Sequence, residues 1–193
     1  MFTTDQQRFL LGLAREAIMT ALTEGRIVTP QIVDEPLRQS LGAFVTLTSN
    51  GDLRGCIGYP EPTFPLYETI IRGGVSAALH DPRFPPVTPG EIEELLIEIS
   101  VLSPLTPIKP EDVVVGTHGL VIEKGRARGL LLPQVPVEWG WNREEFLAHT
   151  CRKAGLPTNA WHTGAALYAF TAEVFSEKEF PPLPDEPVEG TPQ

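Results

Sequence analysis

The chain has 193 residues, of which 41% are hydrophobic, and it carries a formal net charge of -10 with a sequence pI of about 4.8. This length and apolar content suffice for a buried core in one domain or in two small lobes. The negative charge argues against a general nucleic-acid binder and against adsorption to anionic membranes, because both require a positive surface potential.

The cysteine content and the N-terminus indicate a reducing compartment. Two cysteines, Cys56 and Cys151, are too few for a disulfide framework. The first residues lack the basic start and apolar run of a signal peptide, and no apolar segment approaches the roughly 20 residues that span a bilayer. We therefore expect a cytoplasmic protein with free thiols.

The first sixty residues predict a helix followed by a β-hairpin. Thr4 and Gln7 have the spacing of a capping box, and apolar residues then recur every three or four positions up to Gly25, a residue typical of helix ends. A β-branched and aromatic stretch follows, and the Asn50-Gly51 pair after it is a strong hairpin signal. Leu53–Gly58 is therefore predicted to be the returning strand.

This returning strand, Leu53-Arg54-Gly55-Cys56-Ile57-Gly58, places a cationic side chain and a thiol between glycines. Because strand side chains alternate, we expect Arg54, Cys56 and Gly58 on one face and Leu53, Gly55 and Ile57 on the other. We expect Arg54, on that face, to hold an anion and to favour a reactive Cys56, and we expect the glycines to leave room for a ligand.

The next segments predict a helix, a stiff link and a central strand. A helix is expected over 65–79, where Gly73-Gly74 indicates close approach to another backbone, in our interpretation the strand of Gly55. The three prolines of the following link fix the positions of Asp81 and Arg83. Alternation over 91–102 predicts a central strand whose Glu98 and Ser100 face a cleft.

The remaining chain predicts a second hairpin, a third helix, a last strand and a tail. We expect these strands and this helix, in chain order, at 113–122, 129–133, 142–155 and 165–175. The predicted fold class is α+β: a two-lobed single domain over 1–178 with mixed or antiparallel sheets built from hairpins and three main helices. Residues 179–193 are expected to form a flexible, acidic, proline-rich tail, pinned at most by Phe180.

A thiol enzyme would need a base near Cys56. His118, between Gly116 and Gly119, has the flexible surroundings of a functional residue, and Glu98 is a second proton carrier. The alternative is a small buried thiol, because free cysteines are among the most buried residues. The chain has no zinc-binding spacing and no nucleotide or serine-hydrolase signature, so we expect neither a metal nor a cofactor.

A basic turn over 123–128, with Lys124, Arg126 and Arg128, offers charges for a phosphate or RNA backbone, and the three tryptophans offer rings for base stacking. A solvated turn and buried tryptophans are the more common roles of such residues. Nucleic-acid binding is therefore not our leading interpretation.

Dispersed motifs over roughly residues 5 to 178 resemble the AMMECR-type domain family. The motifs that carry the resemblance are Leu53–Gly58, Asp81-Pro82-Arg83-Phe84, Ser100-Val101-Leu102, Gly116-x-His118-Gly119-Leu120, Leu132-Pro133-Gln134-Val135 and Lys153-Ala154-Gly155-Leu156. The resemblance implies a compact two-lobed α+β domain with Leu53–Gly58 at or near the cleft between the lobes. It also implies a link to the AmmeMemoRadiSam set, with a MEMO-like protein and a radical SAM protein as partners.

We therefore expect a module that binds a small anionic molecule or a partner segment at the Leu53–Gly58 strand, as an accessory to a radical SAM/MEMO-like pathway. The expected ligand-binding residues are Arg54, Gly55, Ile57, Gly58, Asp81 and Arg83. One alternative is an enzyme with Cys56 as nucleophile, Arg54 beside it, and His118 or Glu98 moving protons. A second alternative is a nucleic-acid-related regulatory factor.

Overall fold

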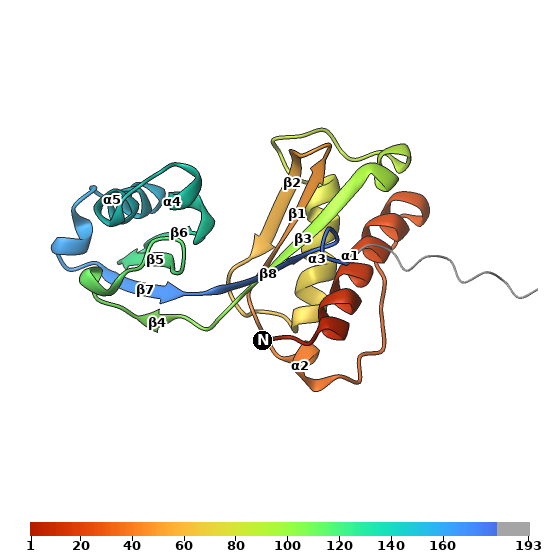
Figure 1. The fold of residues 1–193 in the computed structure, drawn as a ribbon, viewed down its shortest axis with the longest axis horizontal. Coiled ribbons are helices and arrows are strands. Elements are labelled where there is room, and N and C mark those ends of the chain that lie inside the picture. The colour runs from red at the N-terminus through yellow and green to blue at the C-terminus, as the bar shows by residue number, and fades with distance from the viewer. Residues whose placement is uncertain (181–193) are drawn as a thin grey trace, which may run out of the picture.

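A computed structural model describes residues 1–180, which form two lobes lying side by side (Figure 1). The first lobe contains α1 (Thr4–Glu24), α2 (Glu35–Arg38), β1 (Ala43–Ser49), β2 (Asp52–Tyr59), α3 (Leu66–Leu79), β3 (Leu95–Leu102) and β8 (Ala172–Ser176). The second lobe contains β4 (Thr106–Pro107), β5 (Gly119–Lys124), β6 (Ala127–Leu131), α4 (Gln134–Glu138), α5 (Arg143–Lys153) and β7 (Ala166–Phe170). Short 3-10 helices occupy Pro89–Glu94, Pro110–Asp112 and Ala160–His162.

Each lobe is built on one antiparallel sheet. The strand order is β2-β1-β3-β8 in the first lobe and β4-β7-β5-β6 in the second. Helices α1 and α3 cover one face of the first sheet, and α5 packs on β5 and β6 of the second (Figure 1). The predicted α+β class with three main helices is confirmed.

The ends of the long helices follow from local chemistry. The capping box of α1 is formed by Thr3 and Gln6, one residue earlier than predicted, because Thr3 keeps an extended backbone and its side chain accepts from the Gln6 amide. Gly25, with φ 65°, ends α1 as predicted. The predicted Asn142 cap of α5 is confirmed, and its side chain accepts from the Glu145 amide.

The β1–β2 hairpin and its packing on α3 also agree with the sequence. Asn50 and Gly51 have φ values of 53° and 91°, as the two-residue turn requires. A Cβ on Gly55 would overlap the Ala77 carbonyl oxygen of α3. Gly73 lies against Val45 and the Ile57 carbonyl, whereas Gly74 faces α1, so only the first of this glycine pair approaches the β1–β2 hairpin.

Three predicted strands have different bounds in the structure. Strand β3 begins only at Leu95, because Thr88 and Glu91 form a capping box that starts a 3-10 helix before it. Residues 113–118 are a turn rather than a strand, since the amides of Thr117 and His118 both donate to the Val114 carbonyl. The last strand is divided at Thr171 into β7 and β8, which belong to different sheets.

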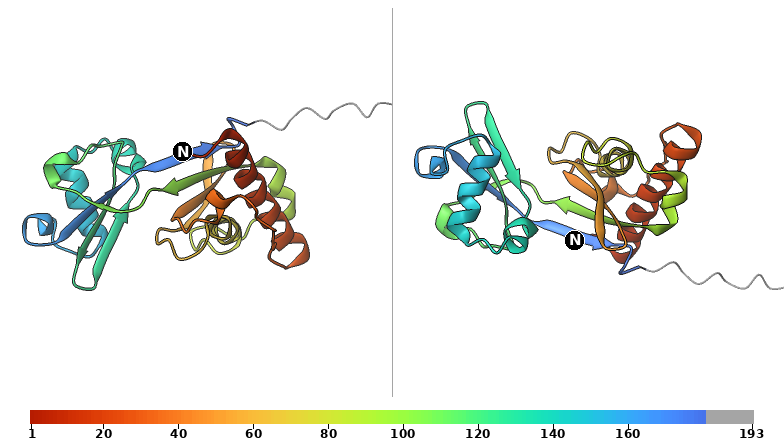
Figure 2. Two further views of the ribbon diagram at one scale, coloured as in Figure 1. Left: turned by 90° about the horizontal axis from the view of Figure 1, so that it is seen from below. Right: turned by 90° about the horizontal axis from the view of Figure 1, so that it is seen from above.

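The chain passes between the lobes twice, at Ser103 and at Thr171, and hydrogen bonds join these two segments. The Ser103 amide donates to the Thr171 carbonyl at 2.9 Å, and the Thr171 amide donates to Ser103 Oγ at 3.0 Å. Figure 2 shows both crossings running side by side between the lobes. Leu102, Val121 and Phe170 form a buried cluster with side chains from both sheets, so the lobes share apolar contact.

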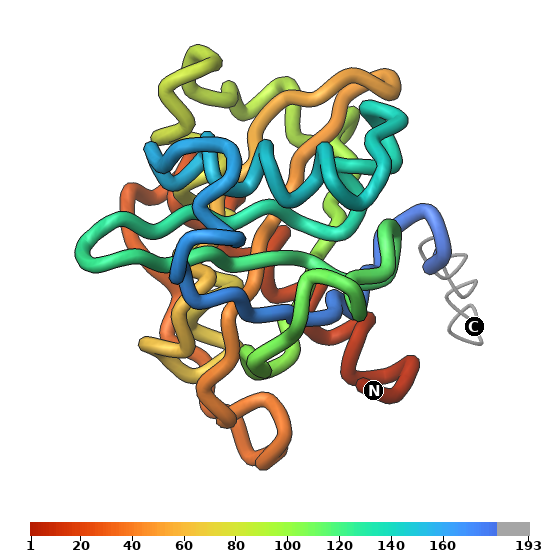
Figure 3. The backbone as a smooth tube through the Cα atoms, turned by 90° about the vertical axis from the view of Figure 1, so that its left-hand side faces the viewer, coloured from red at the N-terminus to blue at the C-terminus, as the bar shows by residue number. Residues whose placement is uncertain are grey.

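The termini of the described chain both lie against the first lobe. In Figure 3, which looks from the second-lobe side, the N-terminus and the end of the described chain lie on the same side of the molecule. The Phe2 amide donates to the Glu173 side chain of β8, and Arg15 of α1 donates to Glu177 at 2.6 and 2.7 Å. Phe180 packs against the first-lobe core, with the Arg8 guanidinium 5.4 Å from its ring centre. Residues 181–193 of the predicted tail lie outside the described residues.

In residues 1–180, no helix combines the length and the apolar character needed to cross a membrane.

Candidate functional site

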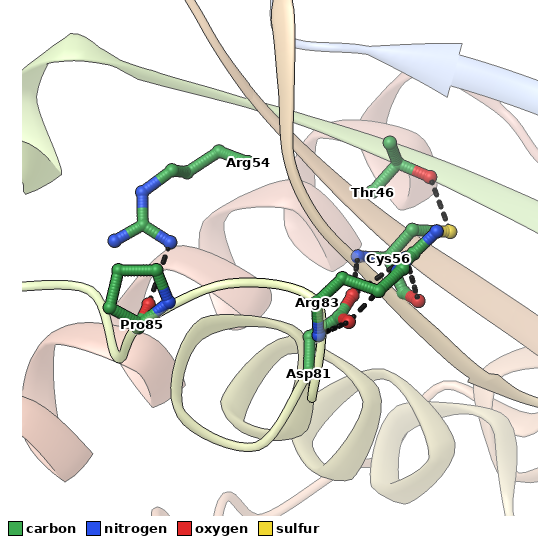
Figure 4. Close-up of polar contacts among 6 residues, drawn as sticks. All are labelled: Thr46, Arg54, Cys56, Asp81, Arg83 and Pro85. Carbon is green, nitrogen blue, oxygen red and sulfur yellow. Dashed lines mark hydrogen bonds and ion pairs between the residues drawn. The ribbon is translucent and has the colours of Figure 1, made fainter.

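The centre of the candidate site is the outer edge of β2 at Cys56. Strand β2 is the last strand of the first sheet, so its outer edge faces no further strand. The Cys56 amide there donates to Asp81 Oδ2 at 2.9 Å, and Arg83 Nη2 donates to the Cys56 carbonyl at 3.2 Å (Figure 4). These two side chains take the hydrogen bonds that a neighbouring strand would otherwise take.

Asp81 and Arg83 are also paired with each other. Arg83 donates from Nε to Asp81 Oδ1 at 2.9 Å and from Nη2 to Oδ2 at 2.7 Å, a two-point guanidinium–carboxylate contact. The Asp81 side chain is 1% exposed and that of Arg83 is 53% exposed. Hydrogen bonds from Arg83, and then from the backbone amides of Cys56 and Arg83, hold the pKa of Asp81 well below its usual range despite its burial. The positions of Asp81 and Arg83 are thus fixed by hydrogen bonds to each other and to the Cys56 backbone.

The thiol of Cys56 lies on the sheet face opposite α1 and α3. The Thr46 hydroxyl donates to Cys56 Sγ at 3.2 Å. Register places Cys56, Thr46, Glu98 and Ser176 in one row across all four strands. This face of the sheet is turned toward the second lobe (Figure 1). Burial raises the pKa of the Glu98 carboxyl, and the negative charge of Glu138 in the second lobe adds to this increase.

Arg54 does not share the surroundings of Cys56, so the predicted Arg54–Cys56 pair is wrong. The β1–β2 register shifts between Leu47 and Thr48, which makes Arg54 the extra residue of a bulge and interrupts the alternation of side chains. Arg54 Nε donates to Glu91 Oε1 at 2.9 Å and Nη1 donates to the Pro85 carbonyl at 2.9 Å. Its side chain is only 14% exposed. Figure 4 shows Arg54 directed to Pro85 and Arg83 directed to Cys56.

Glu91 is the partner that redirects Arg54. Hydrogen bonding to Arg54, with contributions from the amide and hydroxyl of Thr88, lowers the pKa of Glu91 to about 2. Sequence reasoning missed this residue, although the spacing of Thr88 and Glu91 is that of a capping box and predicts a carboxylate held at a helix start. Arg54 and Glu91 therefore tie β2 to the segment that follows α3.

The predicted catalytic residues are not assembled around the thiol. Glu98 lies in the same cross-strand row as Cys56, with Thr46 between them, and burial raises the pKa of its carboxyl. His118 lies in the second lobe, where its Nδ1 accepts from the Val114 amide at 3.1 Å. In residues 1–180, none of the hydrogen bonds of His118 or Glu98 leads to Cys56.

The three other strand residues predicted to bind a ligand contact the protein itself. Gly55 faces the Ala77 carbonyl, and a Cβ on Gly58 would overlap the Phe44 ring. Ile57 packs against the first-lobe core. Both glycines are therefore explained by close packing.

Two cations of the basic turn contact other residues of the protein, and one of the three tryptophans is exposed. Lys124 Nζ donates to the Thr163 carbonyl at 2.8 Å, and Arg128 pairs with Glu61 and Glu123, so these two cations are engaged within the protein. Trp139 is 70% exposed rather than buried. It stacks on Trp141, which in turn stacks on His149.

Within the described part of the chain, no group of three or more His, Cys, Asp or Glu side chains is placed to hold a metal ion.

Comparison with known proteins gives one consistent result. The AMMECR1 family model matches residues 11–175. A protein of Thermococcus gammatolerans is 50% identical over 186 residues, covering 90% of each chain, and one of Methanothermobacter thermautotrophicus is 46% identical over 182 residues, covering 90% of this chain and 95% of its own. The crystal structure of protein PH0010 from Pyrococcus horikoshii superimposes with a TM-score of 0.85 at 45% identity, covering 92% of this chain and 94% of that one. The chain belongs to the AMMECR1 family.

Proposed function

We propose that the chain is a binding module that takes an anionic group, of a small molecule or of a partner segment, at the Cys56 edge of β2. The observation that carries this proposal is the state of Arg83. Its guanidinium is held in place by Asp81 and by the Cys56 carbonyl, yet 53% of its side chain is exposed. A cation that is already oriented loses little entropy when an anion binds it.

In this proposal the two arginines have different roles. Arg83 contacts the anion, and Asp81 positions Arg83. Arg54 is a positioning residue, because its contacts with Glu91 and Pro85 leave it 14% exposed. The enzyme alternative has less support, since neither Arg54 nor His118 lies in contact with the Cys56 thiol in the described residues.

Two kinds of probe test the proposal. Inorganic phosphate represents a small anion, and a purified MEMO-like protein and a purified radical SAM protein represent the partners that the sequence resemblance implies. Binding is measured by isothermal titration calorimetry. At least one of these probes is expected to bind the wild-type chain, and Arg83→Gln is expected to weaken that binding about tenfold or more because it removes a charge-assisted contact.

The matched control is Arg126→Gln, which removes the same charge from an exposed turn of the second lobe and leaves binding unchanged. Because Arg83→Gln leaves the buried Asp81 carboxylate without its cation, the double variant Asp81→Asn/Arg83→Gln provides a folded comparison if the single variant unfolds. Equal binding by the wild type and by the folded Arg83 variant, or no binding of any probe to the wild type, contradicts the proposal.

A further inference from the structure

A second site candidate lies on the helical side of the first lobe, away from Cys56. A pocket of about 510 Å³ opens between α3 and the connector that follows α1. Its volume is within the roughly 300–1,000 Å³ of small-molecule sites. Cys56, Thr46, Asp81 and Arg83 are not among the residues that line it.

The floor of this pocket is apolar and belongs to the core. It is formed by Val28, Ile71 and Val75, which are 7%, 2% and 7% exposed and pack with Leu13 and Ala17 of α1. Because these side chains are held on their inner side by α1, the floor is already formed before a ligand binds.

Three of the residues that line the pocket, Tyr59, Glu68 and Arg72, are connected to one another directly or through Phe64, which lies outside the lining. The Tyr59 ring meets the Phe64 ring edge-on with centres 5.9 Å apart, and the Arg72 guanidinium lies 4.4 Å from the centre of the Phe64 ring. Glu68 accepts from Arg72 at 2.6 and 2.8 Å. These side chains are thus fixed in position, and the charges of Glu68 and Arg72 offset each other.

Several polar groups of the pocket remain available to a ligand. Tyr59, Tyr67, Ser76 and His80, which each carry a polar group, are among the residues that line the pocket. In residues 1–180, none of these groups makes a side-chain hydrogen bond to the protein. An apolar floor with a few unengaged polar groups around it is the usual arrangement of a site that orients a small ligand.

We propose that this pocket binds a neutral, planar heteroaromatic molecule. A planar ring fits because the floor is apolar and Tyr59 and Tyr67 present aromatic surface. Ring heteroatoms are needed to pair with the hydroxyls and the imidazole, which would otherwise lose hydrogen bonds to water. A neutral ligand is favoured because the charges of Glu68 and Arg72, which both line the pocket, offset each other.

The experiment is an amide NMR titration of the wild-type chain with adenosine, indole and riboflavin as separate probes, each in the millimolar range. At least one probe is expected to shift the amides of 27–30 and of α3. Ribose, which lacks an aromatic ring, is expected to shift none of them. Adenosine monophosphate is expected to bind about tenfold more weakly than adenosine because of its charge. The proposal is overturned if none of the three probes shifts these amides, or if ribose or the charged nucleotide does so equally well.

Substitutions then locate the site. Ser76→Phe places a bulky ring in the pocket and is expected to reduce binding at least about tenfold. Thr29→Phe, on the connector that follows α1, serves the same purpose if Ser76→Phe fails to fold. Thr23→Phe, on the exposed last turn of α1 outside the pocket, is the matched control and leaves binding unchanged. Undiminished binding by a folded pocket variant contradicts the assignment.

Discussion

At the scale of single residues, Asp81 links the irregular segment after α3 to the sheet. One carboxylate accepts from the Cys56 amide, from the Arg83 amide and from the Arg83 guanidinium. Its 1% exposed side chain makes this a buried charge that is fully paired. The residue therefore stabilises the fold while it positions Arg83 at the candidate site.

Asp81→Asn is expected to reduce the free energy of unfolding by about 1–3 kcal/mol at neutral pH, because a charged acceptor of several hydrogen bonds is lost. Since the folded state lowers the pKa of Asp81, its stabilisation is complete above the unfolded pKa of about 4 and is lost as the pH falls below that value. The difference between wild type and variant in urea unfolding should accordingly shrink below about pH 4. Asp52→Asn, at the exposed start of β2, is the control. The prediction is contradicted if the difference in unfolding free energy between the wild type and Asp81→Asn does not change with pH.

At the scale of elements, the position of β2 depends on its contact with α3 and on its own irregularity. Gly55 allows the α3 backbone to approach the strand at Ala77. The bulge at Arg54 then turns that side chain to Glu91 and leaves the thiol of Cys56 beside Thr46. Regular alternation would have placed Arg54 and Cys56 on one face, so this one extra residue leaves Arg83 as the arginine in contact with Cys56, at its carbonyl.

Gly55→Ala is expected to lower the free energy of unfolding by about 1–3 kcal/mol or more, because the new Cβ overlaps a backbone oxygen that moves only with the whole helix. Gly12→Ala is the matched control: it lies on the exposed side of α1 with no heavy atom within 4 Å of the added Cβ, and should stabilise by about 0.5–1 kcal/mol. Urea midpoints measure both changes. A Gly55→Ala variant as stable as the wild type would show that α3 does not pack as closely as described.

At the scale of the whole molecule, the two lobes are coupled by a paired crossing and a shared apolar cluster. The hydrogen bonds between Ser103 and Thr171 join the crossings, and the cluster of Leu102, Val121 and Phe170 lies where the sheets meet. Because the lobes share these contacts, we expect them to unfold as one cooperative unit.

Tryptophan fluorescence and far-UV circular dichroism are therefore expected to give the same unfolding midpoint. All three tryptophans lie in the second lobe, whereas the two longest helices, α1 and α3, lie in the first, so the two signals report different lobes. Leu147→Ala, which removes a 1% exposed side chain from the second-lobe core at a cost of about 2–5 kcal/mol, should lower both midpoints equally. A shift in fluorescence alone would mean that the lobes unfold independently.

The sequence by itself determined the features that depend on neighbouring residues. The Asn50-Gly51 turn, the caps at Gly25 and Asn142, the three main helices and the family resemblance all follow from short-range patterns. The sequence also identified Asp81 and Arg83 as candidate site residues on a proline-restricted segment, but it did not predict their contacts with Cys56.

Only the tertiary structure decided which of these residues meet. His118 was separated from Cys56 because a turn in the second lobe uses its ring, and Arg54 was separated from Cys56 by a bulge whose position depends on the pairing with β1. The last strand was divided between two sheets because each lobe takes up half of it. Such outcomes depend on contacts between residues far apart in the chain, which local propensity and alternation do not encode.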